Sequence, residues 1–357
     1  MDFFKKYVSN TLAGSGNQSY FVSDNTEQVG RVFYKIFAGG KYNYSFMFTN
    51  IIDSTYADGS HSKANINCKG WLINSAKALV VSSEEKDFSN CKIKKEYQLM
   101  FNKKAHKDVI SGEIFYSDPV EIECEKDDYI CLETTFNGVE IPYFEELIIP
   151  SYRLFDGKWV SSKQVPLACM VGCDRTVEKK IGFLGDSITE GIGVENNSYA
   201  HWCAKIAEII GDKYSYWNLG IGFGRAADAA SNGIWLEKAK KMDVVTICYG
   251  VNDMGRGYSA TEIKCALETI VRILKDNKVR TILFTVPPFD YDEKTKEKWQ
   301  SINNYILNEM SKITEVYDVV PIWGDKAPNE ERAVFGGHPN EEGCAKLALD
   351  FTEKFKL

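Results

Sequence analysis

A serine at the end of an apolar run is the first residue of the sequence that could do chemistry. Ser187 follows Gly185-Asp186, directly after the apolar run Ile181–Leu184. A serine at a turn between a strand and a helix exposes its hydroxyl, and its backbone N–H lies near the positive helix end, where developing negative charge is stabilised. The same position also suits a serine that only caps the helix. The Gly-Asp-Ser motif alone leaves both interpretations open.

Three further polar groups follow other apolar runs in the second half of the chain. These are the glycine-rich loop Gly220–Gly224, the amide in Gly250-Val251-Asn252, and the imidazole in Gly336-Gly337-His338. Open α/β sheets bind ligands beyond the carboxyl ends of their strands, so we expect these groups to lie near Ser187. The sequence therefore predicts a functional site at this edge of a sheet.

Three polar residues near these motifs are expected to have structural roles. Asp186 and Asp253 flank the serine and the asparagine, and we expect them to order the loops by accepting hydrogen bonds from backbone N–H groups. His201 opens an amphipathic helical pattern beside Trp202, and we expect it to support that helix.

The elements that must position these groups change character near residue 178. Before it, short runs alternate with period two, as in Val120–Glu125, which indicates half-buried strands and predicts a jelly-roll-like β-sandwich over residues 1–178. After it, apolar runs alternate with stretches of helical spacing, which predicts a three-layer, flavodoxin-like α/β domain with a five-stranded parallel sheet over residues 179–357. The predicted strands of this second domain are Ile181–Leu184, Tyr214–Leu219, Val244–Tyr249, Thr281–Val286 and Val316–Ile322.

Composition and charge exclude several classes of function. The net charge is −7 and lysines are interspersed with acids, which argues against binding of nucleic acid. The sequence has no apolar stretch of the ~20 residues that cross a bilayer, and no signal peptide is visible. Cys169 and Cys173 lack the further ligands of a metal site, and no motif implies a cofactor. Together with mostly apolar contexts for the ten cysteines, this predicts a cytoplasmic protein with reduced thiols and no membrane partner.

In combination, the four motifs resemble the SGNH branch of the GDSL hydrolases, which is named for blocks holding Ser, Gly, Asn and His. The resemblance covers about residues 179–357, and the whole chain is similar to two-domain bacterial carbohydrate acetyl esterases with a leading β-sandwich. It implies that Ser187 is the nucleophile and His338 the general base. It also implies an oxyanion hole made of the Ser187 N–H, the Asn252 amide and a backbone N–H of the loop that contains Gly222, Phe223 and Gly224.

The sequence departs from this family at the residue that orients the histidine. Family members usually have Asp-x-x-His, whereas the third residue before His338 is Phe335. Losing the acid of a triad costs roughly 10⁴-fold when the wrong imidazole tautomer results. The orienting group is therefore expected to be a backbone carbonyl, or one of the upstream acids Asp325, Glu330 and Glu331.

A second departure lies in the glycine loop. Alignment from Asn218 puts Phe223 where the family has its oxyanion glycine. A backbone donor survives any side chain, so the function can persist, although a shift of one residue would make Gly222 or Gly224 the donor. The ring of Phe223 would also narrow the pocket, which fits a small acyl group.

Three functional hypotheses follow. The first is a serine esterase that removes short acyl groups, acetyl above all, from a small-molecule or oligosaccharide ester through an acyl-enzyme. The second keeps the chemistry but takes a lysophospholipid or an acyl thioester as substrate. The third is a catalytically inactive carbohydrate-binding protein. The sequence predicts neither the substrate's identity nor the oligomeric state.

Overall fold

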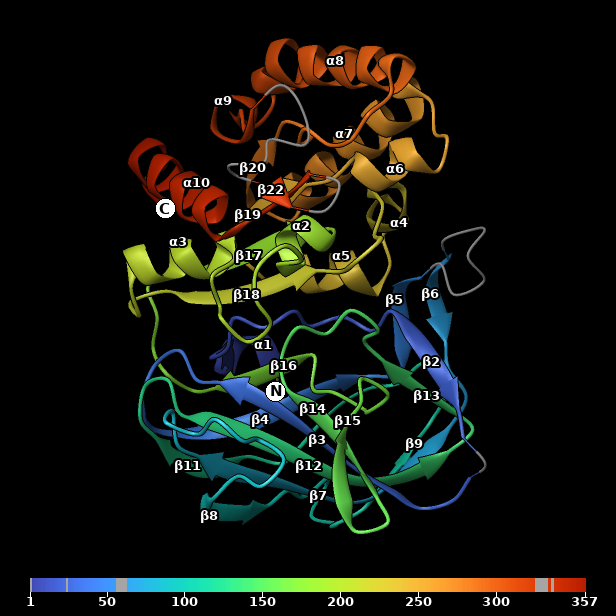
Figure 1. The fold of residues 1–357 in the computed structure, drawn as a ribbon, viewed down its shortest axis with the longest axis vertical. Helices are drawn as coiled ribbons and strands as arrows, with labels where there is room; N and C mark the ends of the chain where they lie inside the picture. The colour runs from blue at the N-terminus through green and yellow to red at the C-terminus, as the bar shows by residue number, and fades with distance from the viewer. Residues whose placement is uncertain (1, 24, 56–62, 325–332, 335–336) are drawn as a thin grey trace. The chain divides into compact units, whose positions relative to one another are not determined.

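The computed structural model describes residues 2–23, 25–55, 63–324, 333–334 and 337–357, and the chain forms two compact units (Figure 1). The first unit comprises Met1–Asp53, Asn65–Val177 and Ser215–Trp217. The second comprises Ser54–Ala64, Glu178–Tyr214 and Asn218–Leu357. No helix in these described ranges is both long and apolar enough to span a membrane.

The first unit is built from antiparallel strands in two main sheets. One sheet has the order β1-β16-β4-β10, and β11 also pairs with β4; the other has the order β15-β14-β3-β12-β7-β8, and β9 also pairs with β7. The first sheet contains β1 (Val8–Ser9), β4 (Gly40–Thr49), β10 (Ile114–Tyr116), β11 (Val120–Cys124) and β16 (Met170–Cys173). The second contains β3 (Gln28–Lys35), β7 (Trp71–Val81), β8 (Ile93–Gln98), β9 (Lys107–Val109), β12 (Tyr129–Gly138), β14 (Ser151–Phe155) and β15 (Lys158–Ser161). Smaller elements are α1 (Phe3–Lys6) and the pairs β2 (Ser19–Val22) with β13 (Glu140–Tyr143) and β5 (Ile51–Thr55) with β6 (Lys63–Asn67). The predicted β-sandwich is confirmed.

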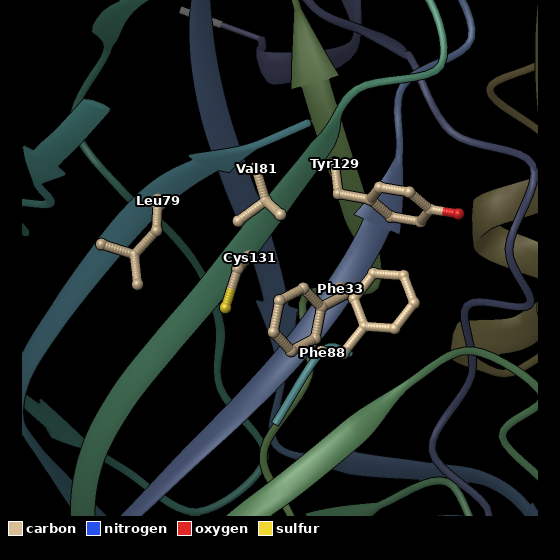
Figure 2. Close-up of a cluster of buried hydrophobic side chains, with 6 residues drawn as sticks. All are labelled: Phe33, Leu79, Val81, Phe88, Tyr129 and Cys131. Carbon is tan, nitrogen blue, oxygen red and sulfur yellow. The ribbon is translucent and has the colours of Figure 1, made fainter. Parts of the chain in front are cut away.

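The strands of this unit are buried to different degrees. In β11 the alternation has the predicted form, because Ile122 and Cys124 are buried while Glu121 and Glu123 are exposed. The first four residues of the central strand β12 are all buried, so neither face of the strand is exposed to solvent there. Figure 2 shows why: side chains from three neighbouring strands form a buried cluster with Phe88, which comes from outside the strands. The cluster contains Phe33, Leu79, Val81, Phe88, Tyr129 and Cys131.

The second unit carries a five-stranded sheet of order β18-β17-β19-β20-β21, the flavodoxin-like order 2-1-3-4-5. The pairings of β17 with β19, of β19 with β20 and of β20 with β21 are parallel. Its strands are β17 (Lys180–Gly185), β18 (Ser215–Gly220), β19 (Val244–Cys248), β20 (Arg280–Phe284) and β21 (Glu315–Tyr317). The strands β17, β18, β19 and β20 are short and almost wholly buried, as strands between covering helices should be, whereas the edge strand β21 is buried only at Tyr317.

The helices of this unit fall into two groups that pack within themselves. One group holds α3 (Trp202–Ile210), α9 (Val320–Trp323) and α10 (Glu341–Lys354). The other holds α4 (Ala226–Ala230), α5 (Ile234–Ala239), α6 (Val251–Gly255), α7 (Ala260–Asp276) and α8 (Glu293–Asn308). Right-handed crossovers place these groups on opposite faces, because the chain leaves β17 in one direction along the sheet and later moves in the other. The predicted three-layer α/β fold is confirmed.

One predicted strand of the second unit is only half right. In the apolar run Val316–Ile322 the strand β21 ends at Tyr317, and α9 begins at Val320. Pro321 lies in the first turn of that helix, where its missing N–H costs no hydrogen bond. The length of the run fits a buried strand, but the proline favours a helix start instead.

Candidate active site

Ser187 is the first residue of the short helix α2 (Ser187–Glu190), directly beyond the carboxyl end of β17. The helix cap is Asp186, whose side chain accepts a hydrogen bond from the N–H of Ile188 at 3.0 Å. This confirms the expectation that Asp186 orders the loop. Because the aspartate caps the helix, the simple interpretation of Ser187 as a capping serine is wrong, and its hydroxyl is available for another role.

That hydroxyl contacts the imidazole of His338, which lies 151 residues further along the chain. The distance from Ser187 Oγ to His338 Nε2 is 2.9 Å, within hydrogen-bonding reach. His338 is only 6% exposed and begins β23 (His338–Pro339), which pairs with β22 (Ala333–Val334). The structure therefore brings together a hydroxyl and a potential base in the arrangement that activates a serine.

The three acids predicted as possible orienting groups for this imidazole, Asp325, Glu330 and Glu331, lie outside the described residues. Phe335, at the position of the family's aspartate, also lies outside them.

The glycine loop lies at the carboxyl end of β18, the strand beside β17. Two of its three candidate donors are engaged within the protein: Gly222 N–H donates to Glu190 Oε2 at 2.9 Å and Gly224 N–H donates to Ile221 O at 3.0 Å. Phe223 between them has a φ of +60°, in the left-handed region where a side chain is unusual. The loop thus keeps, at the position of a phenylalanine, the backbone conformation that glycine adopts most readily.

Glu190 is a residue of this site that sequence reasoning missed. Its side chain is fully buried, and Oε2 receives the Gly222 N–H, which ties the end of α2 to the glycine loop. A buried acid at this spacing from Ser187 has no distinct sequence signal. The one hint in the sequence is the glycine-rich loop that contains Gly222, because its backbone N–H groups need hydrogen-bond acceptors.

Asn252 lies in α6, after β19, the other neighbour of β17. Its Nδ2 donates to the carbonyl of Gly224 at 3.0 Å, and its side chain is partly exposed. A side-chain amide carries two donor hydrogens, so this bond uses one of them. The same bond holds the glycine loop beside the asparagine.

The next residue, Asp253, is fully buried and orders the same loop. Its two carboxylate oxygens accept the N–H groups of Ala226 at 2.9 Å and of Ala227 at 3.2 Å, at the start of α4. The expectation for Asp253 is confirmed. Burial raises the pKa of its carboxyl to about 6, although the two backbone donors act in the opposite direction.

A buried ion pair holds the far end of the glycine loop. Arg225 Nε donates to Asp228 Oδ2 at 3.0 Å, and a second guanidinium nitrogen contacts Asp228 Oδ1. The guanidinium also reaches the hydroxyl of Tyr258 at 2.5 Å. Arg225 is therefore committed to internal partners and holds the chain where α4 begins.

His201 lies apart from this chemistry, as the capping residue of α3. It is fully buried, its Nδ1 accepts the N–H of Ala204 at 3.4 Å, and burial lowers its pKa to about 3. A histidine with so low a pKa is neutral at pH 7. Its place at the helix start matches the structural role expected for it.

Metal ions find no evident site in the part of the chain that the structure describes. No group of three or more His, Cys, Asp or Glu side chains there is arranged to hold one. Cys169 and Cys173 are both buried free thiols.

Comparison with known proteins places the second half of the chain in context. The profile of the GDSL-like lipase/acylhydrolase family matches residues 183–346. No curated protein matches the chain.

Among solved structures, an aryl esterase from M. smegmatis is 16% identical, with a TM-score of 0.43, and the match covers 49% of this chain and 97% of that one. A carbohydrate acetylesterase from Sinorhizobium meliloti is 18% identical (TM-score 0.39; 50% and 98% covered). A variant of an acetyl-xylooligosaccharide esterase from Geobacillus stearmophilus is 19% identical (TM-score 0.41; 51% and 96% covered).

Proposed function

Because residues 183–346 belong to the GDSL-like lipase/acylhydrolase family, we propose that this protein is a serine esterase that removes short acyl groups, acetyl above all, from a carbohydrate. The observation that carries the proposal is the 2.9 Å contact between Ser187 Oγ and His338 Nε2. A serine acylhydrolase needs a hydroxyl that a neighbouring base can deprotonate. At this edge of the sheet, the imidazole of His338 contacts the hydroxyl of Ser187.

In the proposed reaction the neutral imidazole of His338 takes the proton of Ser187 as Oγ attacks the acyl carbon. The tetrahedral intermediate collapses when His338 returns this proton to the leaving alcohol, which gives an acyl-enzyme. Water, activated by the same imidazole, then attacks the acyl carbon and releases the carboxylic acid. The two steps restore both side chains.

The oxyanion of each intermediate is assigned to three hydrogen-bond donors, which lie beyond the carboxyl ends of three adjacent strands. They are the N–H of Ser187, the N–H of Phe223 and the side-chain amide of Asn252. Phe223 is favoured over Gly222 and Gly224 because alignment from Asn218 puts it where related enzymes have the oxyanion glycine, and its φ of +60° keeps a backbone conformation typical of glycine. One such donor is worth on the order of 10²–10³ in kcat.

The group that orients His338 is proposed to be a backbone carbonyl or one of Asp325, Glu330 and Glu331. Either kind of acceptor can fix the imidazole tautomer by accepting the Nδ1 hydrogen, although a carboxylate also stabilises the imidazolium. The variants Asp325→Asn, Glu330→Gln and Glu331→Gln separate these cases. If all three keep near-normal kcat, the carbonyl is the orienting group.

The preference for a small acyl group is assigned to Phe223. Its side chain is half-buried in the glycine loop, next to the proposed backbone donor. A ring at this position leaves less room for the acyl chain than the hydrogen of a glycine would.

Hydrolysis of 4-nitrophenyl esters tests the proposal. We expect turnover of the acetate, slower turnover of the butyrate and longer esters, and a loss of at least about 10⁴-fold in kcat for Ser187→Ala and for His338→Ala. His106→Ala, at an exposed histidine of the first unit, serves as the control and should behave as wild type. Ligand binding without turnover would instead indicate an inactive binding protein, and a preference for octanoate or longer would contradict the acetyl specificity. Acetate release from acetylated xylo- and manno-oligosaccharides would then identify the substrate.

The proposed compartment is the cytoplasm. All ten cysteines are free thiols, and free thiols in such number persist in a reducing compartment. Cell fractionation tests this assignment, and recovery of the protein outside the cytoplasm would contradict it.

A further inference from the structure

We propose that Phe289 is a positioning residue for His338, and that its ring supplies part of the orientation that the aspartate provides in related triads. The inference rests on the proposed function, because it concerns how the base of that reaction is held. Phe289 follows Pro287-Pro288 in the segment between β20 and α8, and it has no polar group that could take part in the chemistry itself.

The ring of Phe289 contacts the imidazole directly. The two ring centroids are 5.2 Å apart and the ring planes make an angle of 75°. This edge-to-face arrangement is the one that aromatic pairs prefer, and it depends on the relative tilt of the rings. A tilt of the imidazole plane away from this angle would therefore weaken the contact.

The backbone beside the imidazole also lies against this segment. Gly337 has a φ of +116°, and a Cβ atom placed on it would lie 2.9 Å from Phe289 Cα and 3.0 Å from Pro288 O. No side chain fits in that space. The residue that precedes His338 is thus held in van der Waals contact with the same two residues that present the phenylalanine ring.

The segment that carries Phe289 is fastened to α8 where it leaves the sheet. Val286 N–H donates to Asn303 Oδ1 at 2.8 Å, and Asn303 Nδ2 donates back to Val286 O at 3.1 Å. Trp299 Nε1 donates to the same carbonyl at 2.8 Å. Three hydrogen bonds from two side chains of one helix therefore fix the start of the segment.

Tyr291 fastens its other end. The Tyr291 hydroxyl donates to Pro287 O at 2.9 Å and its backbone N–H donates to Phe289 O at 2.8 Å. Its ring lies 6.2 Å from that of Phe289 and 6.0 Å from that of Trp299. The rings of Trp299, Tyr291 and Phe289 thus form a row from α8 to the imidazole. The side chains of Trp299 and Tyr291 are each anchored by a hydrogen bond.

A second loop confines His338 as well. Gly193 has a φ of +112°, and a Cβ on it would lie 3.0 Å from His338 Cβ and 2.6 Å from Pro339 O. The histidine is therefore confined at its backbone by Gly193 and at its ring by Phe289.

Replacing Phe289 while keeping or removing its ring tests the proposal. We expect Phe289→Leu, which keeps an apolar side chain but loses the ring, to lower kcat for 4-nitrophenyl acetate about tenfold, with KM within twofold of wild type. Phe289→Tyr keeps the ring and should restore kcat to within threefold. Phe355→Leu is the matched control, because Phe355 is also half-buried in the second unit and contacts other rings at 4.9 and 5.8 Å, but it lies outside the site. It should leave kcat unchanged.

A double-mutant cycle then separates positioning from simple support of the fold. If Phe289 acts through His338, Phe289→Leu should cost nothing further in a His338→Ala background. An equal tenfold loss in both backgrounds, or no loss in the single variant, would overturn the proposal. Phe289→Met gives the same comparison if the leucine variant does not fold. Failure of the proposed function has a different signature, namely wild-type protein without turnover or turnover that survives Ser187→Ala.

Discussion

Asn50 in the first unit and Asn252 in the second both carry an amide just beyond a strand, yet the two amides are used differently. Asn50 is fully buried, and its Nδ2 lies 2.9–3.3 Å from the carbonyls of Cys68, Lys69 and Ile110. Its Oδ1 accepts the indole N–H of Trp71 at 3.0 Å. Asn252 is partly exposed and uses one donor on Gly224. In the sandwich the amide of Asn50 holds loops together, whereas at the edge of the parallel sheet Asn252 is bonded to Gly224 and is proposed to offer its other donor to a substrate.

Two carboxyls with raised pKa values, a half-buried one and a buried one, show the same division. Burial raises the pKa of Glu146 in the first unit to about 7, and its Oε2 has no hydrogen-bond partner within the described ranges. Burial also raises the pKa of Asp253 in the second unit, to about 6, but both of its oxygens hold backbone N–H groups of α4. A raised pKa therefore accompanies a carboxyl with one unpartnered oxygen in the first unit and a loop-ordering carboxyl in the second. The burial of a polar group does not identify a functional site by itself; its partners do.

Among the variants that test this comparison, Asn50→Ala is expected to have the largest effect, and that effect is on stability. The substitution leaves the buried carbonyl of Cys68 and the buried indole N–H of Trp71 without this partner, at roughly 1–3 kcal/mol each, and also removes the part-buried bonds to Lys69 and Ile110. We expect the free energy of unfolding of the first unit to fall by about 4 kcal/mol or more, as measured by chemical denaturation. The kcat of the protein that remains folded should not change. Unaltered stability would contradict the structural role assigned to Asn50.

Asn252→Ala is expected to give the reverse pattern. Loss of one oxyanion donor should lower kcat about 10²–10³-fold, or roughly 3–4 kcal/mol of transition-state stabilisation, with KM little changed. Only one hydrogen bond to Gly224 is lost from the fold, so we expect the melting temperature to change by a few degrees at most. Steady-state kinetics and a thermal melt on the same sample measure both. A large loss of stability with normal kcat would put Asn252 in the same class as Asn50.

The smallest effect is expected from Glu146→Gln, and it depends on pH. Because the folded-state pKa is raised from 4.5 to about 7, the contribution of Glu146 to stability is fully present below pH 4.5 and is lost as the pH rises through 7. The glutamine variant should therefore match wild type near pH 4.5 and exceed it at pH 8.5, by no more than about 3 kcal/mol. Urea unfolding at the two pH values measures the difference.

Asp253→Asn is the matched comparison for that experiment. An asparagine can accept with only one of its two polar side-chain atoms, whereas both oxygens of Asp253 accept an N–H. We therefore expect no gain in stability at pH 8.5 from this variant. A similar gain in both variants would remove the distinction between the carboxyl of Glu146 and the loop-ordering carboxyl of Asp253.

The fold and the main polar groups of the site could be predicted from the sequence because they follow local rules. Continuous apolar runs predicted the parallel strands, and Ser187, Asn252 and His338 follow those runs at turns marked by glycine. The carboxyl ends of parallel strands meet at one edge, so local position was enough to predict that a shared site exists. The structure places Ser187 and His338 in contact.

Other features depend on partners distant in the sequence and could not be predicted. Glu190 has the sequence context of an ordinary helix residue, and its bond to Gly222 shows how the buried acid is used. Phe289 reads as a loop aromatic after two prolines, and only the fold brings it to His338.

The order of the central sheet has one more consequence. The three proposed oxyanion donors come from β18, β17 and β19, which are adjacent strands in that order. Neighbouring strands are held about 4.8 Å apart by main-chain hydrogen bonds, so the sheet fixes the distance between the points where the loops leave it. A side-chain substitution in one loop does not alter that distance. The three loops are also joined by the hydrogen bonds of Gly222 to Glu190 and of Asn252 to Gly224, so a substitution that spares these bonds should leave the spacing of the three proposed donors unchanged.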